Sequence, residues 1–330
     1  MLRIYTREAD HLAFLDASVP ATETQIPVWF DLVNPVHSES TVVESQLAIS
    51  LPTRDEMEEI ELSARLYQED GADFMTITAL ADLDGDDPRK TPITFVLKGA
   101  TLVSIRYAEH KPFEVFSHRV QRANGVGSTC ANGEPVMIGL LEALIDRMAD
   151  TLERLANEID IISREVFRNK ASSATKKTHD LQSLIEQIGR KGDFLTMVRE
   201  SLVSISRLTS YHVAIETSAR KISKESRQRI KLIQRDATSL GEHATFMSSK
   251  INFLLDATLG LINLEQNQII KIFTVASVVF LPPTLVASIY GMNFEIMPEL
   301  KWAAGYPWAV LVMVLSAAMP FLYFKRRGWL

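Results

Sequence analysis

The sequence predicts an N-terminal α/β domain, a long helical stalk and two C-terminal transmembrane helices. Three observations support this fold class. Strand-like apolar runs alternate with helical stretches over the first 125 residues. From residue 135 onward the pattern is helical and poor in proline, and the last sixty residues contain two uncharged apolar runs. The chain is therefore expected to have one large polar part and one membrane part.

The composition narrows the possible partners and the compartment. The 330 residues are 46% apolar and 23% charged, with a formal net charge of −6, so no basic excess points to nucleic acid. The single cysteine, Cys130, excludes an intrachain disulfide. The first sixteen residues carry charges every few positions without an apolar core segment, so no secretory signal is expected. The bulk of the protein is predicted to be cytoplasmic.

Residues 1–130 form the predicted cytoplasmic α/β domain, with a mixed sheet covered by helices. Thr53 and Glu56 have the spacing of a capping box and mark a helix start. Glycine, asparagine and proline near 124–135 mark the end of the domain. The predicted strands lie at 28–33, 74–80, 93–97 and 101–107, and the predicted helices at 42–51 and 55–68.

Residues 131–270 form the predicted helical domain and stalk. Three long helices are expected, at about 135–169, 176–212 and 222–290. The third has no proline before Pro282, so it is predicted to continue without a break into the first membrane span. At 1.5 Å per residue this helix would be roughly 100 Å long.

Residues 271–330 form the predicted transmembrane domain, with spans at about 272–290 and 307–324 and an outer loop at 291–306. Nineteen residues of helix are about 28 Å long, close to the thickness of the hydrocarbon layer. A buried helical hairpin of a soluble protein is the alternative. Lys271 precedes the first span and three basic residues follow the second, so both termini are predicted to face the cytoplasm.

One side of the first span is unusually polar. Positions spaced alternately by three and four fall on one helical stripe, which collects every hydroxyl of the span except that of Tyr290. The stripe consists of Asn267, Ile270, Thr274, Ser277, Leu281, Thr284, Ser288 and Gly291. Small and hydroxylated residues are typical of helix packing in lipid, but they would also line a water-filled path. One helix cannot enclose a path, so the second interpretation requires several copies of the chain.

The end of this span resembles a known family. Tyr290, Gly291, Met292 and Asn293 are followed by FEIMPELKW, and the chain ends in FKRRGWL. Together with the upstream stretch EQNQIIKIFTVASVVFLPPTLVAS, these residues closely resemble the CorA-type magnesium and cobalt transporters. The resemblance implies a homopentameric funnel in the bacterial inner (plasma) membrane, with five copies of the first span around the pore.

The resemblance also implies roles for individual residues. The Gly-Met-Asn motif, with Tyr290 before it, would form the selectivity ring at the outer mouth. Ile270 and Phe273 are at positions where family members often have methionine or leucine. The narrow part of the pore is therefore expected to be apolar but to have a different shape. The pore-lining positions of the family match Asn267, Ile270, Phe273, Leu281 and Thr284, and an acidic position below them matches Asp256.

The chemistry of the outer mouth agrees with a hydrated magnesium ion as cargo. Mg²⁺ releases its inner waters reluctantly, and asparagine amides can accept hydrogen bonds from those waters. Glu295 and Glu299 of the outer loop would raise the local cation concentration, although they could also be merely solvated. A divalent ion moving inward through ~100 mV gains roughly 4.6 kcal/mol, so influx of Mg²⁺, and of hydrated Co²⁺ or Ni²⁺, needs no ATP.

The segment 81–88 is the densest acidic stretch. Its Gly, Asp and Pro residues favour a turn between two strands. The alternative is a low-affinity regulatory magnesium site, which the family resemblance supports. Asp82 and Asp84 are the candidate ligands, with Asp236 on the stalk as their partner. Loss of magnesium there would shift the population towards the open channel.

Functions other than transport have less support in the sequence. The sequence has no Walker A loop, no dinucleotide-binding glycine motif and no histidine spacing typical of a metal or nucleophilic site, so no enzyme, catalytic residue or catalytic cofactor is predicted. A membrane-anchored scaffold without ion flux remains an alternative, as does the related zinc-transporting branch. The MPEL stretch and the absence of extra His or Cys ligands favour a hard, oxygen-seeking ion. The expected partners are other copies of the chain, membrane lipid and divalent cations.

Overall fold

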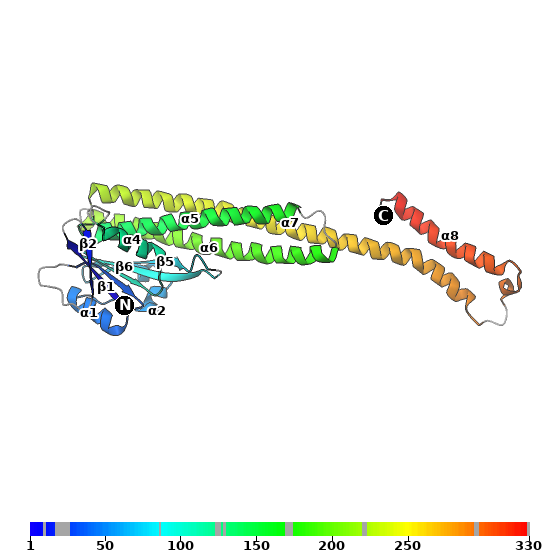
Figure 1. Ribbon diagram of the computed structural model, residues 1–330, viewed down its shortest axis with the longest axis horizontal. Helices are drawn as coiled ribbons and strands as arrows, with labels where there is room; N and C mark the ends of the chain where they lie inside the picture. Colours follow the sequence, from blue (N-terminus) through cyan, green and yellow to red (C-terminus); the bar gives the residue numbers. More distant parts are fainter. Residues whose placement is uncertain are drawn as a thin grey trace. The chain divides into compact units, whose positions relative to one another are not determined.

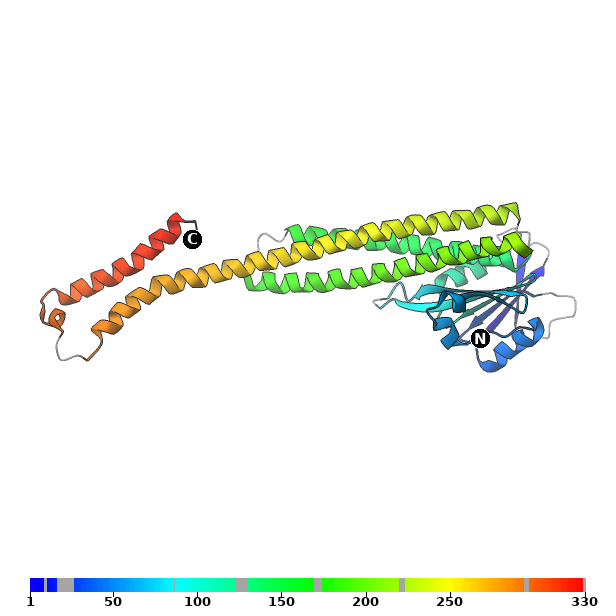
Figure 2. The same cartoon turned by 180° about the vertical axis from the view of Figure 1, so that it is seen from behind.

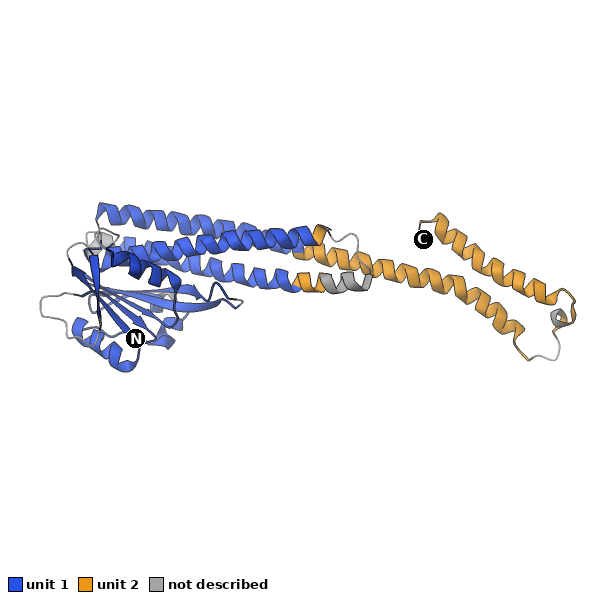
Figure 3. Cartoon of the chain, in the orientation of Figure 1, with its two compact units in different colours: residues 1–165, 186–254 blue, residues 166–185, 255–330 orange. Residues whose placement is uncertain are grey.

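The computed structural model describes residues 1–8, 11–16, 27–85, 87–122, 127, 130–168, 174–219, 223–293 and 297–328. The chain divides into two compact units, coloured separately in Figure 3: residues 1–165 with 186–254, and residues 166–185 with 255–330. The domain boundaries predicted at 130 and 270 lie where the character of the sequence changes. The two units are defined by their compactness instead, so these boundaries stay a prediction.

The first unit contains one seven-stranded sheet, in the order β2-β1-β3-β7-β6-β5-β4. All neighbours are antiparallel except the central pair β3 and β7, which is parallel. The four predicted strands are confirmed, whereas β1, β2 and β4 were not predicted. The strands are β1 (Leu2–Glu8), β2 (His11–Asp16), β3 (Pro27–Val33), β4 (Leu66–Glu69), β5 (Ala72–Ala81), β6 (Arg89–Lys98) and β7 (Thr101–Arg106).

Helices cover both faces of this sheet (Figures 1 and 2). On one face lie α1 (His37–Leu47) and α2 (Arg54–Glu58), whose Val43 and Met57 are buried against Phe30, Phe74 and other apolar side chains of the sheet. On the other face lie α4 (Lys111–Val120), α5 (Gly133–Arg168) and α6 (Ala174–Ala219). Strands β5 and β7 are buried along nearly their whole length, because helices cover both faces of the sheet.

The prediction of one helix over residues 55–68 is wrong. The capping box does form, with the Thr53 backbone N–H donating to Glu56 Oε2 at 2.7 Å, but α2 ends at Glu58. After the short α3 (Leu62–Arg65) the chain enters β4, which pairs with β5. Pairing across the sheet outweighs local helical spacing here, and Tyr67 stacks on Phe74 with the ring centroids 4.7 Å apart.

A turn signal identifies the missed hairpin. Asp70 and Gly71 join β4 to β5 with φ angles of 50° and 69°. Two consecutive positive φ angles are typical of a tight two-residue hairpin turn, and Asp-Gly is a preferred dipeptide for it. The other early helix was also misplaced: α1 begins at His37 and ends at Leu47, because Ala48 adopts the left-handed conformation with φ 51°.

The three predicted long helices are confirmed as α5, α6 and α7 (Lys224–Tyr290), although α6 extends to Ala219. Helix α7 has 67 residues, which corresponds to about 100 Å, and it continues through Pro282 and Pro283. Within the first unit, α7 is tied to α5 by Arg229, whose guanidinium donates to both carboxylate oxygens of Glu142 at 2.8 and 2.6 Å. A 3₁₀ turn, η2 (Pro298–Lys301), precedes α8 (Gly305–Arg326), which matches the second predicted span.

Candidate functional site

The predicted stripe lies on the C-terminal part of α7. In the single chain its side chains are exposed, including the apolar Ile270 and Leu281, which are 61% and 66% exposed. Phe273, beside the stripe, is 70% exposed, and Asp256 is exposed further towards the N-terminus. Helices α7 and α8 are the two described helices that are long and apolar enough to cross a membrane. Such apolar exposure requires lipid or further protein to cover it.

The hydroxyls of the stripe are oriented by the helix itself. Thr274 Oγ1 donates to the carbonyl oxygen of Ile270, and Thr284 Oγ1 donates to that of Phe280, each at 2.7 Å. A hydroxyl whose proton is already donated presents only its lone pairs to other groups. These threonines therefore offer hydrogen-bond acceptors, which suit the water molecules around a cation.

The two prolines modify the same helix. Pro282 and Pro283 lack backbone N–H groups, so the carbonyls of Val278 and Val279 have no helical donor. Carbonyl oxygens left in this way need another donor or water, because unsatisfied backbone groups are costly in an apolar environment. They lie one turn or less from Leu281, on the part of the helix that carries the stripe.

The Gly-Met-Asn motif forms the turn that ends α7. The N–H of Gly291 donates to the carbonyl of Ala287 at 3.0 Å, and that of Met292 donates to Ile289 at 3.2 Å. Gly291 does not have a positive φ, and an added Cβ would meet only the Ala287 oxygen at 3.2 Å and the Ser288 oxygen at 3.6 Å. The backbone of a single chain therefore does not require glycine at this position.

The side chains at the motif differ in their exposure. Met292 is 48% exposed, Asn293 is exposed and Tyr290 is partly buried. The predicted acidic residue Glu295 lies outside the described residues, and of Glu299 the structure describes only its place in η2. Trp302 and Trp308 flank the start of α8, with their ring centroids 6.4 Å apart.

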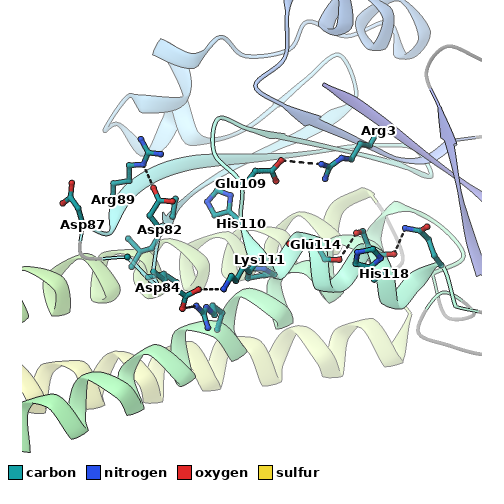
Figure 4. A pocket seen from close by; sticks show the side chains of 18 of the residues that line it. Arg3, Asp82, Asp84, Asp87, Arg89, Glu109, His110, Lys111, Glu114 and His118 are labelled. Carbon is teal, nitrogen blue, oxygen red and sulfur yellow. Dashed lines mark hydrogen bonds and ion pairs between the residues drawn. The ribbon is translucent and has the colours of Figure 1, made fainter.

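The acidic stretch forms the turn between β5 and β6, as one of the two predictions stated. We define the β5–β6 turn as residues 82–85 and 87–88. Asp82 has a positive φ of 58°, its carbonyl accepts from the N–H of Gly85 at 2.9 Å, and its carboxylate accepts from Arg89 Nε at 2.8 Å. The turn borders a cleft of about 1090 Å³, whose opposite wall is formed by α4 (Figure 4).

Asp84 points from this turn towards α4 and α5. It forms ion pairs with Lys111, Arg147 and Arg154. The hydrogen bonds from the first two of these lower the pKa of Asp84 from 3.8 to about 2. The carboxylate is thus held ionised by cations of the same chain.

Asp236 has a different environment. It lies on α7, 3.6 Å from the neighbouring Arg235, and helps to raise the pKa of Asp146 on α5, although burial is the main cause of that shift. Over the described residues, no three His, Cys, Asp or Glu side chains form a group that could hold a metal ion. The three regulatory candidates do not make a site within one chain.

Comparison with known proteins shows the family. The model of the CorA-like Mg²⁺ transporter proteins matches residues 24–326. The chain belongs to this family. It is 36% identical to the magnesium transport protein CorA of Salmonella typhimurium over the full length of both chains, and 37% identical to that of Escherichia coli K12 over 92% of each.

Solved structures agree with the CorA fold. The complete CorA magnesium transporter of Methanocaldococcus jannaschii matches with a TM-score of 0.78 at 18% identity, covering 100% of this chain and 99% of that one. The ZntB cytoplasmic domain of Vibrio parahaemolyticus matches 79% of this chain and 97% of its own with a TM-score of 0.56 at 11% identity. At these identities the likeness concerns the fold alone.

For a CorA-like chain, the structure unites some predicted residues and separates others. The stripe lies along α7, and the motif forms the turn directly after this helix. Asp82 and Asp84 share a turn, but different cations bind them. Sequence reasoning missed the partners of Asp84, because Lys111 and Arg147 are 27 and 63 residues distant from it in the sequence and no local pattern connects them.

Proposed function

We propose that this chain is the subunit of a channel-type transporter that carries hydrated Mg²⁺ into the cell down its electrochemical gradient. The stripe on α7, ending at Asn293, is the observation that carries the proposal. It combines exposed acceptor oxygens with a Gly-Met-Asn turn, in a chain whose full-length relatives are named magnesium transport proteins. Hydrated Co²⁺ and Ni²⁺ are proposed as further cargo, because ions held through their waters are distinguished mainly by size.

Several copies of the chain are needed for this function. A single α7 leaves Asn267, Thr274, Ser277, Thr284 and Ser288 exposed, so an enclosed path requires rotational symmetry. We propose a homopentamer in the bacterial inner membrane, on the resemblance of the sequence to the family. Both termini would face the cytoplasm, because basic residues flank both spans on that side. Native mass spectrometry of the detergent-solubilised protein measures the number of subunits directly.

The selectivity ring has a direct test. Asn293→Ala removes the amide that would accept hydrogen bonds from the waters of the ion, so magnesium uptake into reconstituted vesicles is expected to fall to background while the oligomer stays assembled. Asn157→Ala is the matched control, since this asparagine is exposed on α5 of the first unit. Full uptake by the Asn293 variant would refute the pore assignment. A competition series with Mg²⁺, Co²⁺ and Zn²⁺ would show which of these ions the wild-type protein transports in preference to the others.

Gating by cytoplasmic magnesium is the second part of the proposal. Asp82, Asp84 and Asp236 are the acids that we associate with this response, and any metal site near them would have to be completed by another subunit. Bound magnesium would hold subunits in a closed state, and its release would favour opening. Inhibition of uptake by magnesium loaded inside the vesicles measures this response.

A further inference from the structure

Three cations from two helices converge on the single carboxylate of Asp84. Lys111 Nζ, at the start of α4, donates to Oδ2 at 2.5 Å, and Arg147 Nη2 of α5 donates to Oδ1. Arg154, two turns further along α5, donates to the same Oδ1 at 3.5 Å through Nη1. Its Nη2 also donates to the carbonyl of the neighbouring Leu83. Figure 4 shows the contact between Lys111 and Asp84 across the cleft.

This arrangement makes Asp84 a poor ligand for a divalent cation. Both of its oxygens already accept charge-assisted hydrogen bonds, which are stronger than neutral ones. A magnesium ion bound to either oxygen would lie within a few ångströms of three positive charges and be repelled by each. Binding would therefore first require Asp84 to leave all three partners.

The other acids of the β5–β6 turn differ. Among the residues that the structure describes, Asp82 is paired only with Arg89, and both side chains are more than half exposed. Asp87 is exposed and forms no ion pair with any residue that the structure describes. The turn thus has one carboxylate directed at the helices and two that face solvent.

We propose that Asp84 is a positioning residue that fastens the β5–β6 turn to α4 and α5, and is not itself a magnesium ligand. The attachment is two-fold, since Leu83 is buried and its carbonyl is held by Arg154 as well. It fixes where Asp82 and Asp87 stand relative to the helices. The expected effect on the magnesium response rests on the proposed gating. The attachment of the turn to α4 and α5 does not depend on it.

A charge exchange tests the attachment. Asp84→Lys places a cation among three others, and the amides of the turn are expected to exchange hydrogen about fivefold faster, which corresponds to about 1 kcal/mol, the upper value for an exposed ion pair. Adding Arg147→Glu gives the new lysine an acid partner and is expected to restore much of the protection. Asp87→Lys is the matched control, because it makes the same charge change in the same turn at an acid without an ion pair to any described residue. Unchanged exchange in the Asp84→Lys protein would overturn the proposal.

The magnesium response separates positioning from ligation. If Asp84 positions the turn, Asp84→Lys weakens inhibition by internal magnesium and the added Arg147→Glu recovers it. If Asp84 is a ligand, the double variant Asp84→Lys with Arg147→Glu regains amide protection but is still not inhibited by internal magnesium. That result would overturn the inference. A wild-type protein that internal magnesium does not inhibit would remove the proposed gating, and amide exchange would then decide the attachment by itself.

Discussion

The buried ion pair between β3 and β7 gives the sharpest prediction for stability. Arg106 is fully buried and Asp31 is 1% exposed; Nη2 of the arginine donates to Asp31 Oδ2 at 2.8 Å and Nε to Oδ1 at 3.1 Å. Asp31→Ala removes both acceptors and leaves a charge inside the sheet. Removing one partner of a buried pair costs about 3–5 kcal/mol. We expect a cost at the lower end of this range, because Nη1 of Arg106 still donates to Glu109 Oε2 and to the carbonyl of Ala108.

The single cysteine offers the assay. Cys130 is fully buried in the first unit, so its reaction with a fluorogenic maleimide during heating reports the opening of this unit in the full-length protein in detergent. A loss of about 3 kcal/mol corresponds to a midpoint roughly 6–12 °C lower for a unit of this size. Asp193→Ala is the control, because this acid is exposed on α6 and is expected to change stability by less than about 0.5 kcal/mol.

A double variant tests the physical reason. Asp31→Leu with Arg106→Met replaces both charges with apolar side chains of similar volume, which is often nearly neutral. It is expected to cost less than half as much as Asp31→Ala. A shift below about 2 °C for Asp31→Ala, or a double variant that is equally unstable, would show that the uncompensated charge is not the cause.

Two further predictions concern protonation and the motif. Burial and the nearby Arg106 lower the pKa of His110 from 6.5 to about 4, so the unfolded chain binds a proton that the folded chain does not, and stability falls as pH falls from 6.5 towards 4. The loss is about 2 kcal/mol at pH 5, and His110→Asn should abolish this part of the pH dependence in thermal unfolding followed by circular dichroism; an unchanged slope would contradict it. Gly291→Ala should leave the unfolding midpoint within about 2 °C, since the added methyl group meets the Ala287 oxygen at 3.2 Å and needs only a small shift at the end of the helix, but it should lower magnesium uptake at least about tenfold by narrowing the proposed ring. Wild-type uptake by that variant would place Gly291 outside the ion path.

The sequence alone determined the features that depend on neighbouring residues. The length of α7, the two apolar spans, the polar stripe and the capping box at Thr53 all follow from spacing within a few turns. The Gly-Met-Asn turn and its surroundings were enough to indicate the family. For these elements the helix period or local hydrogen bonds suffice to predict the structure, so knowledge of distant contacts is not needed.

The remaining features depend on residues that are far apart in the sequence. Residues 66–68 have helical spacing, yet they belong to β4 because β5 offers a ladder of hydrogen bonds. Asp84 lies in a stretch that suggests a metal site, yet cations from α4 and α5 occupy its carboxylate. Asp31 and Arg106 are 75 residues apart, and a buried charge is tolerated only where the fold supplies its counter-charge. Local sequence patterns reveal the period of a helix or strand. The stability of a buried charge or of a paired strand depends on which groups the fold places beside it.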